Sequence, residues 1–183
     1  MFPRGEENKK KKRRAYLDDF RQTTTGAYEY KGIHYVWDGG EAEWKHQMRM
    51  NWVYAVFMAA AVIGAGCLPV PSMINCVYVI LPFTVCFICA VSVIWGLCRL
   101  SSGGKSLRSY VYDATVEQIP LRSIGTMIGA AATMAGEVVY LVKNGFEGKT
   151  VSAVFFLLTL VCAFFLAKIL RANIQKMVWK RSI

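Results

Sequence analysis

Four blocks of apolar residues organise this chain: Trp52–Gly66, Ile74–Leu97, Ile124–Val142 and Val151–Ala167. None of them contains Lys or Arg, and only the third contains an acid, Glu137. At about 1.5 Å per residue the third block is roughly 28 Å long as a helix, close to the ~30 Å hydrocarbon core of a bilayer. The pattern predicts an all-α integral membrane protein with four transmembrane helices and a short aromatic N-terminal cytoplasmic segment.

The blocks divide the chain into five parts. A basic arm and an aromatic, hairpin-like segment occupy residues 1–40, and an interfacial helix with transmembrane helices 1 and 2 occupies residues 41–99. A cytoplasmic loop follows over residues 100–121. Transmembrane helices 3 and 4 occupy residues 122–170, and a basic cytoplasmic tail ends the chain over residues 171–183.

Three polar segments carry local patterns of their own. Tyr28–Trp37 is rich in β-formers and is interrupted at Lys31-Gly32, which predicts a hairpin or extended segment whose aromatic rings pack on the helix ends. Ser106–Gln118 suits a short interfacial helix. In the tail, basic and apolar residues alternate, which predicts a helix that leaves the membrane and lies along its surface.

The basic residues predict the orientation. Of the 22 Lys and Arg residues, all but Lys143 and Lys149 precede the first block, lie between the second and third, or lie at or beyond the end of the fourth. Cytoplasmic loops carry such an excess of positive charge. We therefore expect both termini and the 100–121 loop in the cytoplasm, and a location in a plasma or inner membrane.

The third block has a face of small and polar residues. Steps of four, three and four residues define two adjacent stripes, one of Gly125, Gly129, Ala132 and Gly136, the other of Thr126, Ala130, Thr133 and Glu137. Small residues allow helices to approach closely inside a membrane. We expect the first stripe to pack against another helix and Glu137 to face the interior of the bundle or an oligomer interface.

Glu137 has two interpretations. A carboxylate within a bilayer must be paired, hydrated or protonated. It is either a cation- or proton-coupling ligand, with Thr133 and Thr126 beside it, or a packing group hydrogen-bonded to a neighbouring helix. A coupling site needs a cavity that reaches Glu137, whereas packing needs only a dry seam.

Six consecutive basic residues lie in the N-terminal arm: Lys9, Lys10, Lys11, Lys12, Arg13 and Arg14. Such a run binds anionic lipid headgroups, at about 1 kcal/mol per basic residue near the surface, or serves as a signal that keeps the N-terminus inside. Either explanation accounts for the run, so we expect a lipid bilayer as partner and no nucleic acid.

The six cysteines fall in or beside the blocks. Cys67 and Cys76 flank the predicted outer turn, where a disulfide can form if the compartment is oxidising. Cys86 and Cys89 form a Cys-x-x-Cys sequence at mid-membrane. A thiol there stays protonated and unreactive, so we interpret this pair as packing residues and not as a redox centre.

The sequence contains no Ser/His/Asp set, metal cluster or paired carboxylate in a place where a substrate could meet it. We therefore expect no enzyme, no cofactor and no metal. The favoured function is a non-enzymatic accessory or assembly subunit of a membrane complex, with another membrane protein or a second copy as partner. The alternative is a small oligomeric transporter or channel that uses Glu137.

Overall fold

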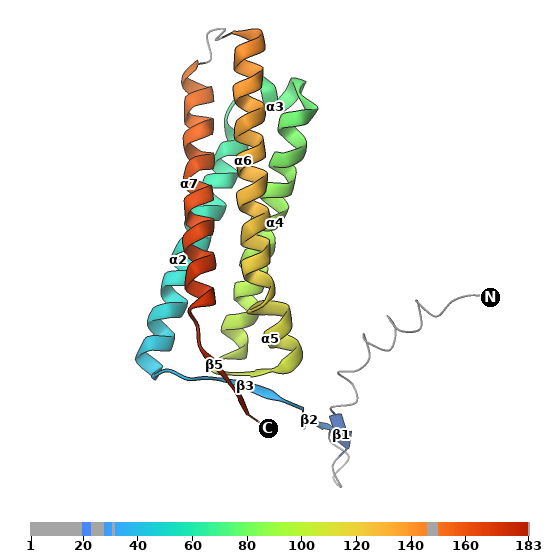
Figure 1. Ribbon diagram of the computed structural model, residues 1–183, viewed down its shortest axis with the longest axis vertical. Helices are drawn as coiled ribbons and strands as arrows, with labels where there is room; N and C mark the ends of the chain where they lie inside the picture. Colours follow the sequence, from blue (N-terminus) through green and yellow to red (C-terminus); the bar gives the residue numbers. More distant parts are fainter. Residues whose placement is uncertain (1–19, 23–27, 31, 146–149, 183) are drawn as a thin grey trace, which may run out of the picture.

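The computed structural model describes residues 20–22, 28–30, 32–145 and 150–182. Four long helices form an elongated bundle (Figure 1): α2 (Glu41–Cys67), α4 (Val77–Gly103), α6 (Gln118–Asn144) and α7 (Thr150–Gln175). Each of them is long and apolar enough to cross a membrane. The prediction of four such helices is confirmed.

The four helices follow one another around the bundle. α4 packs against α2 and α6, and α7 also packs against α2 and α6. The short helix α3 (Ser72–Asn75) precedes α4, and α5 (Ser109–Thr115) precedes α6. One end of the bundle carries three strands and is called the base here; the opposite end, called the top, carries α3 (Figure 1).

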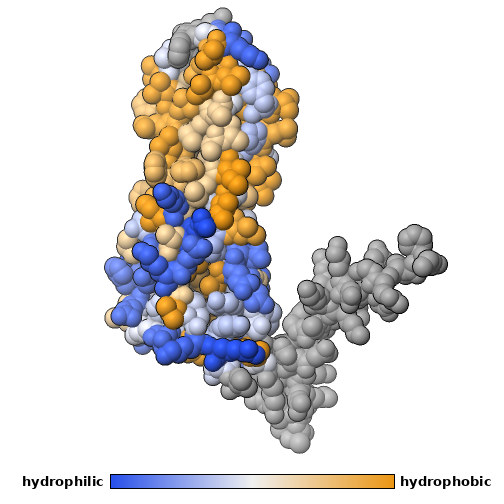
Figure 2. Space-filling view, viewed as in Figure 1, coloured by the Kyte–Doolittle hydropathy of each residue, from blue (hydrophilic) through white to orange (hydrophobic). Residues whose placement is uncertain are grey.

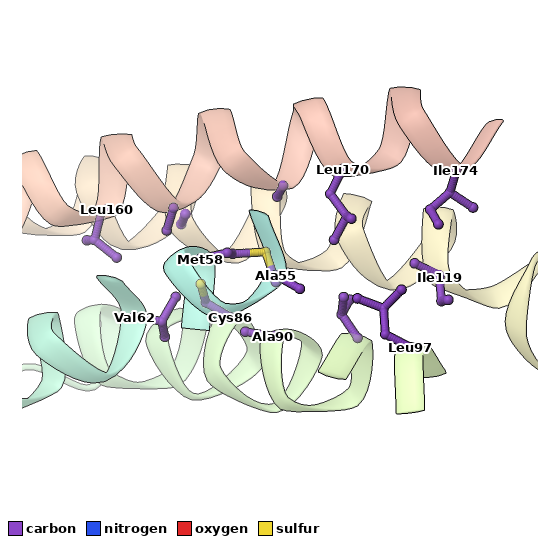
Figure 3. Close-up of a cluster of buried hydrophobic side chains, with 14 of the residues drawn as sticks. Ala55, Met58, Val62, Cys86, Ala90, Leu97, Ile119, Leu160, Leu170 and Ile174 are labelled. Atoms are coloured by element: carbon purple, nitrogen blue, oxygen red, sulfur yellow. The ribbon is translucent and has the colours of Figure 1, made fainter. Parts of the chain in front are cut away.

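Apolar side chains from all four helices meet along the bundle axis (Figure 3). Each helix contributes residues at steps of three and four, which form one stripe on a helical surface. Residues in this core with no exposed surface include Met58, Val62, Cys86, Leu97, Ile119, Leu160 and Leu170. The helices are therefore joined by apolar contacts along most of their length.

Glycines set the distance between α4 and α6. A Cβ atom at Gly129 would lie 2.8 Å from the backbone nitrogen of Cys86, and one at Gly136 would lie 2.9 Å from the carbonyl oxygen of Tyr78. Side chains do not tolerate such distances to backbone atoms, which cannot move aside. The two helices can approach this closely only because both positions lack a side chain.

A three-stranded antiparallel sheet closes the base. β3 (His34–Trp37) lies between β4 (Ser106–Arg108) and β5 (Trp179–Ser182). In the register of the sheet, Tyr35 is paired with Leu107 on one side and with Arg181 on the other. The strands come from before α2, between α4 and α6, and after α7, so the sheet joins three distant parts of the chain.

This sheet corrects several predictions. The chain is not all-α. Of the two alternatives for Tyr28–Trp37, its described residues fit the extended segment and not the hairpin. β2 (Tyr28–Tyr30) pairs with β1 (Phe20–Gln22), whereas β3 pairs with β4 and β5. The 106–118 segment begins as a strand before its helix, and the tail is a strand from Trp179. The alternation of basic and apolar residues in the tail fits a strand equally well once β3 supplies hydrogen bonds.

Aromatic rings connect the sheet to α2. The ring centroids of Trp37, Trp44 and Trp179 lie 5.6, 5.7 and 5.9 Å apart, at tilted and edge-to-face angles that favour aromatic attraction. Tyr112 lies 6.0 Å from Trp179 and stacks on Tyr35 at 4.0 Å. The aromatic residues of β3 and β5 therefore pack on the helix ends of their own chain.

The outer surface of the molecule has an apolar part and a hydrophilic part. The upper part of the bundle is largely apolar and the base is largely hydrophilic (Figure 2). Large apolar side chains on the helices are widely exposed, among them Phe57 (63%), Leu81 (60%) and Leu158 (60%). An apolar surface of this extent is typical of contact with lipid or with another protein.

We expect Gly129→Ala to destabilise the bundle by about 1–3 kcal/mol, because the added methyl group meets the α4 backbone. Gly64→Ala is the matched control, since a Cβ atom at Gly64 has no neighbour within 4 Å. Unfolding of the purified protein in mild detergent, followed by circular dichroism, measures both. Equal stability of the two variants would contradict the close approach of α4 and α6.

Candidate functional site: a buried carboxylate on α6

Glu137 lies inside the bundle. Its exposed fraction is 0%, so no water-sized space touches the side chain in this conformation. The hydroxyl group of Ser72, at the start of α3, donates a hydrogen bond to Oε2. Oε1 is also buried, and it has no hydrogen-bond partner among the described residues. The carboxyl group therefore links α6 to α3 through one of its two oxygens.

Ser72 reaches Glu137 because α2 ends below the top of the bundle. Gly66, in the last turn of α2, lies against the ring of Phe83, which is well inside α4. The segment between Cys67 and Ser72 therefore continues from the end of α2 towards the top of the bundle in a non-helical conformation. Val70, in the middle of this segment, is only 2% exposed.

Two prolines favour the irregular backbone of this partly buried segment. Pro69 and Pro71 have no backbone N–H, so two donors that would need an acceptor are absent. The N–H of Leu68 donates to the carbonyl of Ala65, and the N–H of Val70 donates to that of Leu68 at 2.8 Å. Irregular backbone at membrane depth occurs where it is buried in protein and its polar groups are satisfied.

The two threonines predicted beside Glu137 are also buried. The Thr126 hydroxyl donates to the carbonyl of Arg122 at 3.2 Å, and the Thr133 hydroxyl donates to that of Gly129 at 2.7 Å. Both donors are thus used within α6, and neither is directed at the carboxyl group. A ligand-binding or coupling role for the three residues stays a prediction.

Three residues of the predicted small-residue stripe lie against α4, and the fourth is exposed. Gly129 and Gly136 face the α4 backbone, and a Cβ atom at Gly125 would lie 2.7 Å from Sγ of Cys89. Ala132 is exposed. At 100° per residue, Ala132 lies 60° to the outer side of Gly129, whereas Thr133 lies 40° to the inner side.

Two other predicted sites remain open. Cys67 is exposed, Cys76 is half-buried, and both thiols are free in the structure. Their pairing under oxidising conditions stays a prediction. The basic run from Lys9 to Arg14 lies outside the described residues.

Sequence reasoning missed two buried polar residues. Ser72 follows Pro71, and no local pattern points from it to a partner on α6. Asn51 is fully buried; its Nδ2 contacts Sδ of Met177 at 3.7 Å, and its Oδ1 has no described partner. Asn51 continues the buried stripe of Trp44 and Met48 at a step of three, so its spacing could have revealed it.

The described residues also form a cleft at the base, at the opposite end of the bundle from Glu137. A cleft of about 420 Å³ at the base is lined by Trp37, Ala42, Glu43, His46 and Gln47. Within the described residues, no three His, Cys, Asp or Glu side chains come together as a metal site would require.

We expect Glu137→Leu to lower stability by about 1–3 kcal/mol, because the buried Ser72 hydroxyl loses its acceptor. Glu137→Gln keeps both the shape and an acceptor oxygen, so it should have a much smaller effect. A double-mutant cycle with Ser72→Ala, measured by unfolding in detergent, isolates the interaction. Strictly additive effects would show that the two side chains do not stabilise each other.

Comparisons with known proteins were made at three levels. No family model, no curated protein and no solved structure matches this chain.

Proposed function

We propose that this chain is a non-enzymatic, multi-pass membrane protein that serves as an accessory or assembly subunit of a membrane complex. The observation that carries the proposal is a group of small residues near the middle of the exposed face of α6, between the larger exposed residues Ile128 and Val139. Ala131, Ala132 and Ala135 are all exposed on this helix. Figure 2 shows that part of the upper face of the molecule is paler than its strongly apolar flanks.

The alanine face is separate from the two faces that α6 uses within the chain. Gly129 and Gly136 face α4, and Thr133 and Glu137 face the interior. Lipid chains are contacted equally well by large side chains, as on α7, where Phe155 and Leu158 are exposed. Small residues one turn apart, as at Ala131 and Ala135, allow a second helix to approach closely. We therefore assign this face to a helix of a partner membrane protein or of a second copy.

The sheet supports an even number of membrane crossings between its strands. Two long helices, α2 and α4, separate β3 from β4, and two more, α6 and α7, separate β4 from β5. All three strands meet at the base, so their connections return to one side. The basic residues of the base then favour a cytoplasmic location for that end, in a plasma or inner membrane.

Reporter fusions test this topology. A reporter inserted after Asn144, at the top, should be active only in the outer compartment, and one placed after Ser182, at the base, only in the cytoplasm. Insertions that leave the chain folded but report the same compartment at both positions would contradict four crossings.

The alternative function is a small oligomeric transporter or channel that uses Glu137. One observation favours it: Oε1 of this carboxyl group has no described partner, so it has capacity for a cation or proton. The absence of exposed surface at Glu137 favours the packing role. Glu137→Gln separates the two, because it should leave partner association intact in an assembly subunit and should abolish transport in a transporter.

We expect Ala135→Leu to reduce association with the partner, because the larger side chain holds the second helix away from α6. Val154→Leu, at an exposed position of α7, is the control. Each variant is isolated from native membranes in mild detergent, and the ratio of any co-purifying protein or second copy is quantified. A fixed ratio that only Ala135→Leu reduces supports the proposal. A wild-type chain that is isolated alone, as a monomer, would contradict it.

A further inference from the structure

Two cations lie on α7 where its apolar surface ends. The helix has no charged residue from Val151 to Ala167, and Lys168 and Arg171 then follow one turn apart, on the same side of the helix. α6 packs beside α7, and its apolar stretch begins after Arg122. Figure 2 shows hydrophilic side chains on this face, over the lower ends of the two helices.

Neither cation is neutralised by an acid in the described part of the chain. The ion pairs found there all use Glu41 or Asp38 as the acid. Glu117, at the start of α6, is exposed and takes part in no described ion pair. Lys168 and Arg171 therefore present positive charge that an external anion can meet.

Arg171 is more than a cation extended into water. Its Nε is buried, and it has no hydrogen-bond acceptor among the described residues. A buried charged donor without an acceptor is unfavourable. The Arg171 side chain as a whole is only partly buried, so an external phosphate can meet the terminal N–H groups of its planar guanidinium, and two of these can bind two phosphate oxygens. Lys168 is exposed one turn away and can contact the same phosphate.

Apolar residues beside these cations point to a lipid as the source of the phosphate. Phe165 and Ile169 are 54% and 41% exposed. Both residues are within one turn of Lys168 on α7. An anionic phospholipid matches both parts of this surface, because its acyl chains can cover the apolar residues while its phosphate meets the cations. Basic sites between membrane helices bind lipid headgroups in this way.

We propose that an anionic phospholipid binds at the base ends of α6 and α7, with its phosphate held by Lys168 and Arg171. This inference rests on the membrane-spanning part of the proposed function and does not require a protein partner.

The test uses the purified full-length chain in a neutral detergent. Phosphatidylglycerol, phosphatidylcholine or inorganic phosphate is titrated in, and binding is followed by the thermal unfolding midpoint and by native mass spectrometry. We expect phosphatidylglycerol alone to raise the midpoint and remain bound. Lys168→Gln combined with Arg171→Gln should weaken its apparent affinity roughly 10- to 100-fold, the effect of losing charge-assisted hydrogen bonds. Lys143→Gln, which removes an exposed cation at the top, should leave the affinity unchanged.

The outcomes separate this site from other anion binding. If the double variant does not fold, Arg171→Lys replaces it; this variant keeps the charge and removes the paired N–H groups, so it should still weaken binding. Equal affinity in the wild type and in a folded Arg171 variant would overturn the proposal. Equal affinity for inorganic phosphate or for phosphatidylcholine would overturn it too, since the site would then not select an anionic lipid.

Failure of this inference is distinguishable from failure of the proposed function. A chain that binds phosphatidylglycerol through Lys168 and Arg171 but is isolated from native membranes as a monomer retains the lipid site and loses the assembly role. A chain with a fixed partner and no lipid selectivity retains the assembly role alone.

Discussion

The contact of α6 with the α4 backbone at Gly129 fixes how every other face of α6 is used. A helix turns 100° per residue, so once Gly129 is placed against Cys86 the directions of all other side chains follow. Glu137 then faces the interior, where α3 supplies Ser72, and Ala135 faces outward. A side chain at Gly129 would disturb the carboxyl site and the alanine face together, although it belongs to neither.

The long helices could be predicted from the sequence because their signal is local. An apolar block of about 20 residues has few alternatives to a helix that can cross a membrane. The sheet could not be predicted in the same way. β3, β4 and β5 are strands of three or four residues, and each is stabilised by strands far away in the chain. Nothing within Trp179–Ser182 distinguishes a strand that pairs with β3 from a helix on a membrane surface.

The candidate site was predictable in part, for a related reason. Glu137 is conspicuous as the acid within an apolar block, and helical periodicity gives its neighbours on α6. Its hydrogen-bond partner depends on where α2 ends and how Pro69 and Pro71 carry the chain upward, which periodicity does not describe. Ala132 is exposed, unlike Gly129, because a step of three residues turns through only 300°, which moves the side chain 60° around the helix.

The three-stranded sheet also has a consequence for the order of folding during synthesis. β3 emerges from the ribosome before any of the long helices, and its partner β5 emerges after all of them. Until then one edge of β3 lacks its hydrogen-bond partner, and the rings of Trp37 and Trp44 lack their contacts with Trp179. A chain with an incomplete set of helices therefore exposes unpaired backbone and indole rings at its base. Completion of the sheet conceals both, so a quality-control factor that recognises such features would distinguish finished molecules from unfinished ones.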